Sequence, residues 1–371
     1  MTREGYCAKI EEAICHLDFK GTLIDYERYG HGHINDTFVV RFIQEDQSIL
    51  RYILQRMNHE TFHRPDQLMK NIAGVTGFLR KKIILNKGDV NRETMNIIAT
   101  KDGNTYYRDS IGSYWRAYLF IEDATCFDLV EKPEDFYQSA IAFGRFQELL
   151  ADYPADTLFE TIKDFHNTPA RLDNLRKAVE KDILGRVKEV TAEIEFALQR
   201  EEFIHTLMDL YEAGKLPLKV THNDTKLNNI MIDNKSGEAI CVIDLDTVMP
   251  GFSVTDFGDS IRFGASTGAE DEPDLSKVNF DLKLYEIYTK GFLEGCNGSL
   301  SETERAMLPV GAKMMTLECG IRFLTDYLQG DTYFRTHREG HNLDRARTQF
   351  KLVADMEQHW KEMITIVNKY R

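Results

Sequence analysis

The chain has 371 residues, of which 42% are hydrophobic and 29% are charged, and its 46 basic and 60 acidic residues give a net charge of −14 at pH 7. This length is sufficient for two domains of ordinary size, each with a buried core, and the composition is that of a globular protein. The negative balance argues against a nucleic-acid partner, which requires a basic surface.

Cysteine positions and hydropathy further limit which class of protein this chain can belong to. The six cysteines are scattered, with no C-x-x-C pair and no histidine cluster at metal-ligand spacing. No run approaches the roughly 18 apolar residues of a membrane helix, and the N-terminus lacks the apolar stretch of a signal peptide. We therefore expect a reduced, cytoplasmic protein without a membrane span. No pattern indicates its oligomeric state.

Before residue 123 the sequence favours short strands around one helix. The helix is predicted over residues 65–81, with Pro65 suited to the first helical position. Runs of β-branched and aromatic residues predict strands over 37–42, 48–57, 95–100, 105–108 and 113–121. This pattern predicts an N-lobe, residues 1–123, built from a small antiparallel sheet and one helix.

After residue 123 helical periodicity dominates. Two of the helices are expected to end at the glycines Gly214 and Gly330. The predicted helices cover 134–150, 168–184, 186–213, 281–294, 303–329 and 342–369. A mainly helical C-lobe, residues 124–371, follows, so the predicted fold class is α+β with two lobes.

The polar stretch Thr221 to Ile232 interrupts this helical region. It lies between the apolar residues around Val220 and an apolar run at 230–232, and a turn at Asn234-Lys235-Ser236-Gly237 leads into a second strand over 239–243. The resulting hairpin is predicted to bring Asp244, in the segment VIDLDT, back beside Asn229.

Three oxygen-bearing side chains in this stretch and at the end of the following hairpin have the spacing that phosphoryl transfer requires. Attack by a hydroxyl on the γ-phosphorus of ATP needs a base, for which Asp224 is the candidate. Mg²⁺ takes one or two hard oxygen ligands from protein, for which Asn229 and Asp244 are the candidates. The pattern Asp-x-x-x-x-Asn, with Lys226 two residues after the aspartate, resembles the catalytic loop of protein kinases. Lys226 is then expected to offset charge on the phosphoryl group.

The same residues resemble the aminoglycoside phosphotransferase superfamily of small-molecule kinases, and within it the N-acetylhexosamine 1-kinases. The motifs HNDTKLNN (222–229) and IDLDT (243–247) carry the superfamily resemblance, whereas GHGHINDT (30–37), LQRMN (54–58) and LECGIRFLTDYL (317–328) carry the narrower one. The resemblance covers nearly the whole chain. It implies a bilobal protein-kinase-like fold and an ATP- and Mg²⁺-dependent enzyme.

The nucleotide is expected between the lobes. A tight turn around Gly30, His31, Gly32 and His33 allows backbone amides to approach phosphate oxygens, although a plain hairpin turn would look the same. The resemblance places this loop close to both ATP and the sugar. Residues 118–122, including Phe120 and Glu122, are positioned like the hinge that contacts adenine through its backbone.

One feature departs from the protein-kinase pattern. The strand that should end in a phosphate-gripping lysine reads Tyr-Ile-Leu-Gln-Arg, with Gln55 at the lysine position, and the helix over 65–81 contains no glutamate to pair with it. The hexosamine kinases resemble this chain in having Gln-Arg here. Arg56 is the nearest cation and the candidate phosphate ligand, with a solvated arginine at the strand end as the alternative.

For the sugar, the resemblance points to Arg322 and Tyr333, with Phe263 as a possible apolar wall. A guanidinium and a phenol can hydrogen-bond sugar hydroxyls, and an aromatic ring can pack on C–H groups. The alternatives are an ordinary ion pair of Arg322 with Glu318 or Asp326 and core positions for the two aromatic residues.

Three further polar residues are assigned structural roles. His222 is expected to brace the loop backbone by a hydrogen bond. Asp256 and Asp259 are expected to cap or brace the helix that begins near Ser253.

The sequence thus predicts an ATP-dependent kinase that phosphorylates the anomeric hydroxyl of an N-acetylhexosamine and feeds amino-sugar salvage. Its partners are a small-molecule sugar and the nucleotide, with Asp224 contacting the sugar hydroxyl. Two alternatives stay open. One is a kinase for another hydroxylated substrate, such as an aminoglycoside, choline or homoserine. The other is a catalytically silent nucleotide-binding module.

Overall fold

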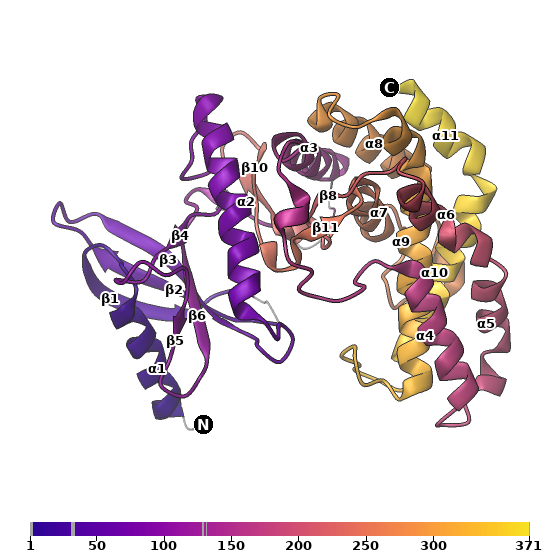
Figure 1. Ribbon diagram of the computed structural model, residues 1–371, viewed down its shortest axis with the longest axis horizontal. Coiled ribbons are helices and arrows are strands. Elements are labelled where there is room, and N and C mark those ends of the chain that lie inside the picture. Colours follow the sequence, from indigo (N-terminus) through magenta and orange to yellow (C-terminus); the bar gives the residue numbers. More distant parts are fainter. Residues whose placement is uncertain (1–2, 31–33, 128–129, 131, 371) are drawn as a thin grey trace. The chain divides into compact units, whose positions relative to one another are not determined.

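The computed structural model describes residues 3–30, 34–127, 130 and 132–370, which form two compact units (Figure 1). The N-terminal unit consists of Met1–Thr125, Thr157–Ile162 and Met231–Val248. The helical unit consists of Cys126–Asp156, Lys163–Ile230 and Met249–Arg371. The mixed fold predicted from sequence, with a β-rich N-terminal region and a helical C-terminal region, is confirmed.

An antiparallel sheet is the framework of the N-terminal unit. Its strand order is β1-β2-β3-β6-β4, and β5 pairs with β6. The strands are β1 (Thr22–Arg28), β2 (Asp36–Ile43), β3 (Ile49–Met57), β4 (Ile97–Ile98), β5 (Tyr107–Arg108) and β6 (Tyr114–Leu119). The segments predicted over 95–100 and 105–108 are reduced to two-residue strands, because residues 99–101 hydrogen-bond to the chain at His16 and Asp18 instead.

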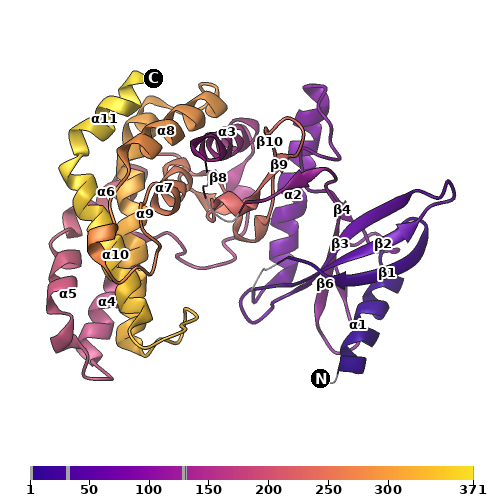
Figure 2. The same ribbon diagram turned by 180° about the vertical axis from the view of Figure 1, so that it is seen from behind.

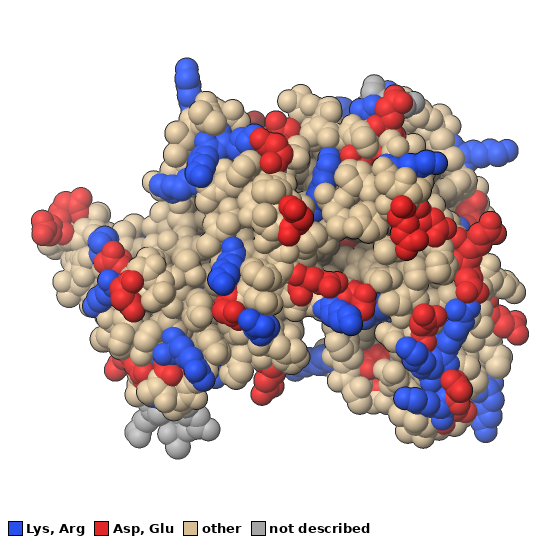
Figure 3. All heavy atoms as spheres, viewed as in Figure 1, with Lys and Arg blue, Asp and Glu red and all other residues tan. Residues whose placement is uncertain are grey.

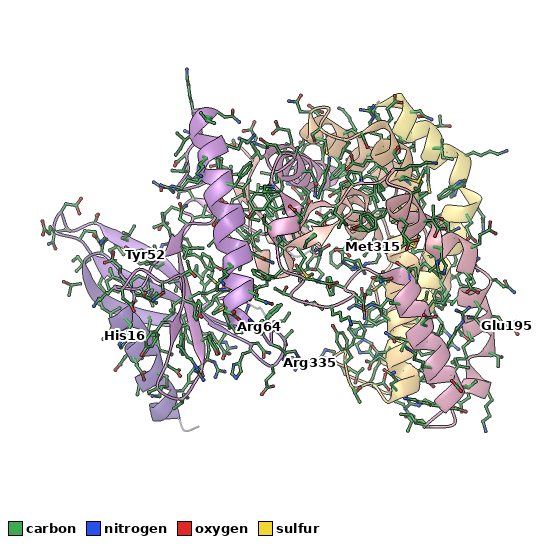
Figure 4. The ribbon with its side chains drawn as sticks, viewed as in Figure 1. His16, Tyr52, Arg64, Glu195, Met315 and Arg335 are labelled. Atoms are coloured by element: carbon green, nitrogen blue, oxygen red, sulfur yellow. The ribbon has the colours of Figure 1, made fainter. Side chains whose placement is uncertain are left out.

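The two faces of this sheet have different roles. Helix α1 (Arg3–His16) packs on the face that presents Phe38, Leu54 and Trp115 (Figures 1 and 2). Tyr52, labelled in Figure 4, belongs to the same core and is 2% exposed. Since side chains alternate along a strand, the residues between these positions face the other way.

Helix α2 (Pro65–Leu85) is four residues longer than the predicted helix and begins, as expected, at its proline. Its buried Asn71 donates to the carbonyl oxygens of Phe159, at 2.8 Å, and Val248, at 3.0 Å. The helix thereby ties the two later segments of the chain into the N-terminal unit.

A second sheet has the order β10-β9-β7, formed by β7 (Ala124–Thr125), β9 (Ile230–Asp233) and β10 (Ala239–Val242). The β9–β10 turn is closed by the Asp233 amide donating to the Glu238 carbonyl at 2.9 Å. The predicted hairpin is therefore confirmed. It leads the chain from the polar loop into the short 3-10 helix Leu245–Thr247.

In the helical unit, α9 (Glu302–Gln329) packs against several other helices, and its Met315 is buried in the interior (Figure 4). A two-stranded antiparallel sheet of β8 (Lys219–Thr221) and β11 (Met249–Gly251) lies in the same unit. The helices are α3 (Pro133–Leu149), α4 (Thr168–Lys181), α5 (Thr191–Leu198), α6 (Glu201–Glu212), α7 (Ser253–Gly264), α8 (Leu282–Cys296), α9 (Glu302–Gln329), α10 (His341–Gln358) and α11 (Trp360–Lys369). Short 3-10 turns cover Ala155–Thr157, Val187–Glu189, Leu227–Asn229 and Leu275–Lys277.

Two predicted helices are broken. The stretch 186–213 divides into a 3-10 turn, α5 and α6, because Arg200 leaves the helix and donates to the Phe196 carbonyl and to Glu357 of α10. The stretch 342–369 bends at His359, so that α10 packs on α5 and α9 whereas α11 packs on α8 and α9. Tertiary contacts decide both breaks, since neither stretch contains glycine or proline at the break.

Helices α7 and α9 approach each other backbone to backbone. A Cβ atom on Gly258 would stand 2.2 Å from the Gly311 carbonyl oxygen, and one on Gly311 would stand 2.1 Å from that of Val254. Glycine is required because any side chain at this crossing would overlap main-chain atoms. The crossing places the polar side of α7, with Asp256 and Asp259, within the helical unit.

Gly311→Ala is therefore expected to lower the free energy of unfolding by about 2 kcal/mol, as overpacking does when backbone atoms must move. Chemical denaturation measures the change. Gly77→Ala is the matched control: Gly77 is an exposed position in α2 with no atom within 4 Å of an added Cβ, so alanine should be neutral or stabilise by up to about 1 kcal/mol. Equal effects of the two substitutions would contradict a tight α7–α9 crossing.

Charged side chains of both signs are interspersed over the face drawn in Figure 3. Charged residues in the described part of the chain form ion pairs, such as Arg200 with Glu357 at 2.7 Å and Arg176 with Glu201 at 2.6 Å. Among the described residues, no helix combines the length and the apolar character needed to cross a bilayer.

Candidate active site

The polar loop after β8 is held by hydrogen bonds from β11 and from helix α7. Strand β8 pairs with β11, and the Thr221 hydroxyl donates to the Met249 carbonyl at 3.0 Å. The backbone then turns through Asn223, whose φ of 65° lies in the left-handed region that asparagine tolerates better than most residues. This turn directs the next residue, Asp224, away from the strand.

Asp256 of α7 is the main support of this turn. Its two carboxylate oxygens accept from the backbone amides of His222 and Asn223, both at 2.8 Å, and Gln147 donates to it at 2.9 Å. The expectation that Asp256 caps its own helix is wrong, because the position before α7 is Phe252 and makes no side-chain cap. Burial raises the pKa of Asp256, although the loop amides oppose that shift. The buried carboxylate thus holds the loop backbone in place through these hydrogen bonds.

Asp259, one turn further along α7, supports the next part of the loop. It accepts from the Thr225 amide at 2.9 Å and pairs with Arg262 at 3.1 Å. Burial raises the pKa of Asp259, but the charges of Arg262 and Lys226 outweigh it and keep the pKa below its usual value. Asp259 therefore braces the loop and also, through Arg262, its own helix α7.

The structure brings Asp224, Lys226 and Asn229 together. Lys226 Nζ lies 2.7 Å from one carboxylate oxygen of Asp224, and Asn229 Nδ2 donates to the other at 3.2 Å and to the Asp224 carbonyl at 2.8 Å. The Asp224 side chain is 30% exposed, so a substrate hydroxyl can reach it. Burial lowers the pKa of Lys226, but the Asp224 charge outweighs this and raises it, so the lysine is cationic.

His222 has the bracing role predicted for it. Its Nδ1 accepts from the Asp224 amide at 3.3 Å, and the edge-to-face rings of Phe143 and Phe146 fix the imidazole in the core. The side chain is fully buried. It therefore positions the candidate base without being exposed to a substrate.

Asp244 lies in the N-terminal unit, directly after β10. Its backbone adopts φ 59° and ψ 57°, a left-handed conformation found at turns and functional sites. Among the described residues, no group of three or more His, Cys, Asp or Glu side chains is arranged to hold a metal ion. Asn229, whose amide nitrogen is engaged by Asp224, and Asp244 each offer an oxygen, the ligand type that Mg²⁺ prefers, and this ion takes few ligands from protein.

Arg56 lies on the sheet face that packs against α1. Its guanidinium pairs with Asp36, with Nε donating at 2.9 Å, and lies over the ring of Tyr6 at 5.2 Å. Burial and a hydrogen bond to Asp36 raise the pKa of Tyr6 to about 12, so the phenol donates throughout the physiological range. This placement argues against the interpretation of Arg56 as the phosphate ligand.

The opposite face carries a different arginine. Arg116 of β6 is 1% exposed and pairs with Asp246, two residues after Asp244. Burial disfavours its charge, but Asp246 outweighs that effect with help from Asp244, so the pKa of Arg116 is raised. A charged residue inside the apolar run 113–121 was the signal in the sequence from which this ion pair could have been found.

The other predicted nucleotide contacts lie in the N-terminal unit. Gly30 is exposed with φ 74°, after the Tyr29 amide pairs with the Thr37 carbonyl at 2.9 Å. Phe120 and Glu122 are both engaged by Arg51, which stacks on the ring at 3.9 Å and pairs with the carboxylate. The predictions for His31, Gly32 and His33 lie outside the described residues.

Arg322 of α9 lies among aromatic rings. Its guanidinium carbon is 5.4 Å from the rings of Phe165 and Phe334 and 5.9 Å from that of Tyr333, which is 67% exposed. Glu318 and Asp326, the alternative partners from sequence, are engaged elsewhere. Glu318 pairs with His166 and Thr168, whereas Asp326 accepts from the amides of residues 332–334. Phe263 on α7 is partly buried.

His166 was not predicted, and it connects this region to the catalytic loop. Its Nδ1 lies 2.8 Å from Glu318, and its Nε2 lies 3.4 Å from the carbonyl oxygen of Asn223, the residue before Asp224. Glu318 is buried, and although burial raises its pKa, His166 and Arg322 outweigh that effect and lower it. No local signal marks His166, because its partners lie 57 and 152 residues away.

A β-rich N-terminal unit followed by a helical unit that carries an Asp-x-Lys-x-x-Asn loop defines a kinase-type phosphotransferase. The chain belongs to the phosphotransferase enzyme family, which it matches over residues 25–286.

Solved structures share the fold. A microcompartment-associated aminopropanol kinase has a TM-score of 0.59 at 13% identity, with 96% of this chain and 98% of that chain covered. The amicoumacin kinase hAmiN, solved with AMP-PNP, Ca²⁺ and Ami, has a TM-score of 0.57 at 14% identity, covering 96% and 99%. Choline kinase from Cryptosporidium parvum Iowa II has a TM-score of 0.55 at 14% identity, covering 93% and 92%. These likenesses show a common fold.

Proposed function

We propose that this protein transfers the terminal phosphoryl group of ATP to the anomeric hydroxyl of an N-acetylhexosamine, GlcNAc or GalNAc, and releases the sugar 1-phosphate. The observation that carries the proposal is the braced, partly exposed Asp224 with Lys226 and Asn229 on its two carboxylate oxygens. Asn229 and Asp244 would be the ligands of Mg²⁺, which when bound would neutralise charge on the phosphates of ATP, the phosphoryl donor.

In this proposal the residues of the chain orient the acceptor and move its proton. Asp224 accepts the hydroxyl proton as the sugar oxygen forms its bond to phosphorus and the bond to ADP breaks. Lys226 is cationic and neutralises charge on the transferring group. Asp256 and Asp259 keep the loop backbone in place through their hydrogen bonds, so the loop needs little reorganisation at the moment of reaction.

The choice of a sugar rests on the resemblance in residues 30–37, 54–58 and 317–328 and on the environment of Arg322. An arginine that lies among three aromatic rings, one of them exposed, offers both a hydrogen-bonding fork and apolar surfaces, the combination that sugars require. His166 links the same helix to the loop of Asp224. Both features belong to the helical unit, which supports a common substrate site.

An acceptor panel with Mg²⁺–ATP tests the proposal. GlcNAc or GalNAc is expected to give a kcat/KM at least roughly 10²-fold above that for aminopropanol, choline, homoserine or an aminoglycoside, because buried polar groups reject substrates that leave them unpaired. The product phosphate should be acid-labile, as glycosyl phosphates are. The methyl glycoside of GlcNAc, which lacks the anomeric hydroxyl, is the matched control and should accept no phosphate.

Arg322→Ala in the same assay should raise KM for the sugar while leaving nucleotide affinity unchanged. Arg176→Ala, which removes an exposed arginine paired with Glu201, serves as its control. A better turnover with any other acceptor would replace the sugar assignment. Absence of transfer to every acceptor, with nucleotide still bound, would favour a silent nucleotide-binding module.

A further inference from the structure

Three polar side chains form a row across the N-terminal sheet. Thr37 of β2, Gln55 of β3 and Arg116 of β6 are directly paired in the strand register, so their side chains point to the same face. Arg116 Nε donates to Gln55 Oε1 at 3.0 Å, and Gln55 Nε2 donates to Thr37 Oγ1 at 3.0 Å. Gln55, at the position of the usual kinase lysine, thus orients a neighbouring arginine.

The row ends on the segment that carries the candidate metal ligand. Arg116 Nη1 donates to one carboxylate oxygen of Asp246, and Asn35 Nδ2 donates to the other at 2.7 Å. Asp246 is 5% exposed and stands two residues after Asp244. Both of its oxygens are therefore used to hold the Asp244 turn on the sheet.

The same contacts extend to the residues that begin β2 and end β3. Asn35 directly precedes β2, and its Oδ1 accepts from the Asn58 amide at the end of β3 at 2.9 Å. On the other side, Asn71 of α2 donates to the Val248 carbonyl. The turn at 244–248 is thus attached to β2 and β3 through Asp246 and to α2 through Val248.

We propose that Arg116 is the positioning residue of the candidate metal ligand: through Asp246 it sets the backbone of Asp244, and through Asp246 and Asn35 it couples that turn to the start of β2 and the end of β3. It takes the structural place of the missing strand lysine from the adjacent strand. The proposal rests on the proposed kinase function, and its tests use the nucleotide and the free protein without any sugar.

The first test measures ADP affinity with Mg²⁺ and with EDTA by calorimetry, for the whole protein. The ratio of the two Kd values reports the contribution of the metal. Arg116→Met should reduce the ratio of the Kd with EDTA to the Kd with Mg²⁺ at least about tenfold, as loss of groups that orient metal ligands does. Asn35→Ala should also reduce this ratio. Arg41→Met is the matched control, since it removes an arginine of the same sheet that pairs instead with Asp25 and Glu27.

The second test follows amide hydrogen exchange of residues 244–248 in the protein without ligand. Exchange there should be at least about tenfold faster in Arg116→Met than in Arg41→Met, since the turn loses its buried anchor. If Arg116→Met does not fold, Arg116→Lys and Asn35→Ala provide the comparison. Lysine retains the charge but cannot donate to Gln55 and Asp246 with the same planar fork.

An unchanged Kd ratio together with unchanged exchange in the folded variants would overturn the proposal. A merely structural ion pair would lower stability without changing the metal dependence of ADP binding. If the wild-type protein bound no ADP under either condition, the proposed function would fail instead, which distinguishes the two failures.

Discussion

Replacing Asp224 by asparagine is expected to lower turnover by at least roughly 10²-fold, the lower end for loss of a positioned general base. The amide cannot accept the hydroxyl proton, although it has nearly the same size and its single oxygen can still accept from Lys226, while Asn229 keeps its bond to the carbonyl oxygen of residue 224. Nucleotide affinity should change little. Steady-state kinetics with the sugar acceptor, and calorimetry with ADP, measure the two quantities.

The control for this substitution is Asp173→Asn, at an exposed residue of α4 in the same unit. It should leave both turnover and ADP affinity unchanged. Turnover of Asp224→Asn at the wild-type level would exclude this carboxylate from the reaction, and a parallel loss of ADP affinity would assign it to nucleotide binding.

The second large effect is expected for Asp256→Ala. The substitution removes the carboxylate to which the buried backbone amides of His222 and Asn223 donate, whereas Gln147 keeps its bond to the Val220 carbonyl. Because each buried donor without a partner costs about 1–3 kcal/mol, the free energy of unfolding should fall by about 3 kcal/mol or more. Turnover should fall as well, since these two amides directly precede Asp224. Urea denaturation and steady-state kinetics measure the changes.

Asp256→Asn separates the hydrogen bonds from the charge. Asparagine retains one acceptor oxygen and removes a charge that burial disfavours, so its loss of stability should be smaller than that of alanine. Asp173→Ala should stay within about 0.5 kcal/mol of the wild type, as exposed substitutions do. If Asp256→Ala lowered the free energy of unfolding no more than Asp173→Ala, Asp256 would not support the candidate catalytic loop.

Local patterns predicted much of the fold because they act over a few residues. The helix beginning at Pro65, the hairpin around Asn234-Lys235-Ser236-Gly237 and the helix ending at Gly330, with φ 100°, all follow from turn and cap chemistry. The breaks at Arg200 and His359 did not follow, because packing against α9 and α10 sets them. The same distinction holds for the candidate site.

The candidate catalytic loop could be found in the sequence because Asp224, Lys226 and Asn229 lie close together in the chain, and the chemistry they would perform specifies their spacing. Asp256 and Asp259 were expected to cap or brace their own helix, and their hydrogen bonds to the loop were not predicted, because the loop amides lie more than 30 residues earlier in the sequence. Arg56 and Arg116 illustrate the same limit. Strand pairing alone assigns one to the α1 face and the other to the face of Asp246.

The sequence by itself determined the class of chemistry, the β-rich and helical halves and the residues of the candidate catalytic loop, because periodicity and short motifs encode local conformation and local donor sets. Only the tertiary structure decided which buried charges hold that loop, and that Thr157–Ile162 and Met231–Val248 belong to the N-terminal unit. Hydrogen bonds between residues distant in sequence, such as Arg116 with Asp246, depend on register and packing, which no local pattern contains.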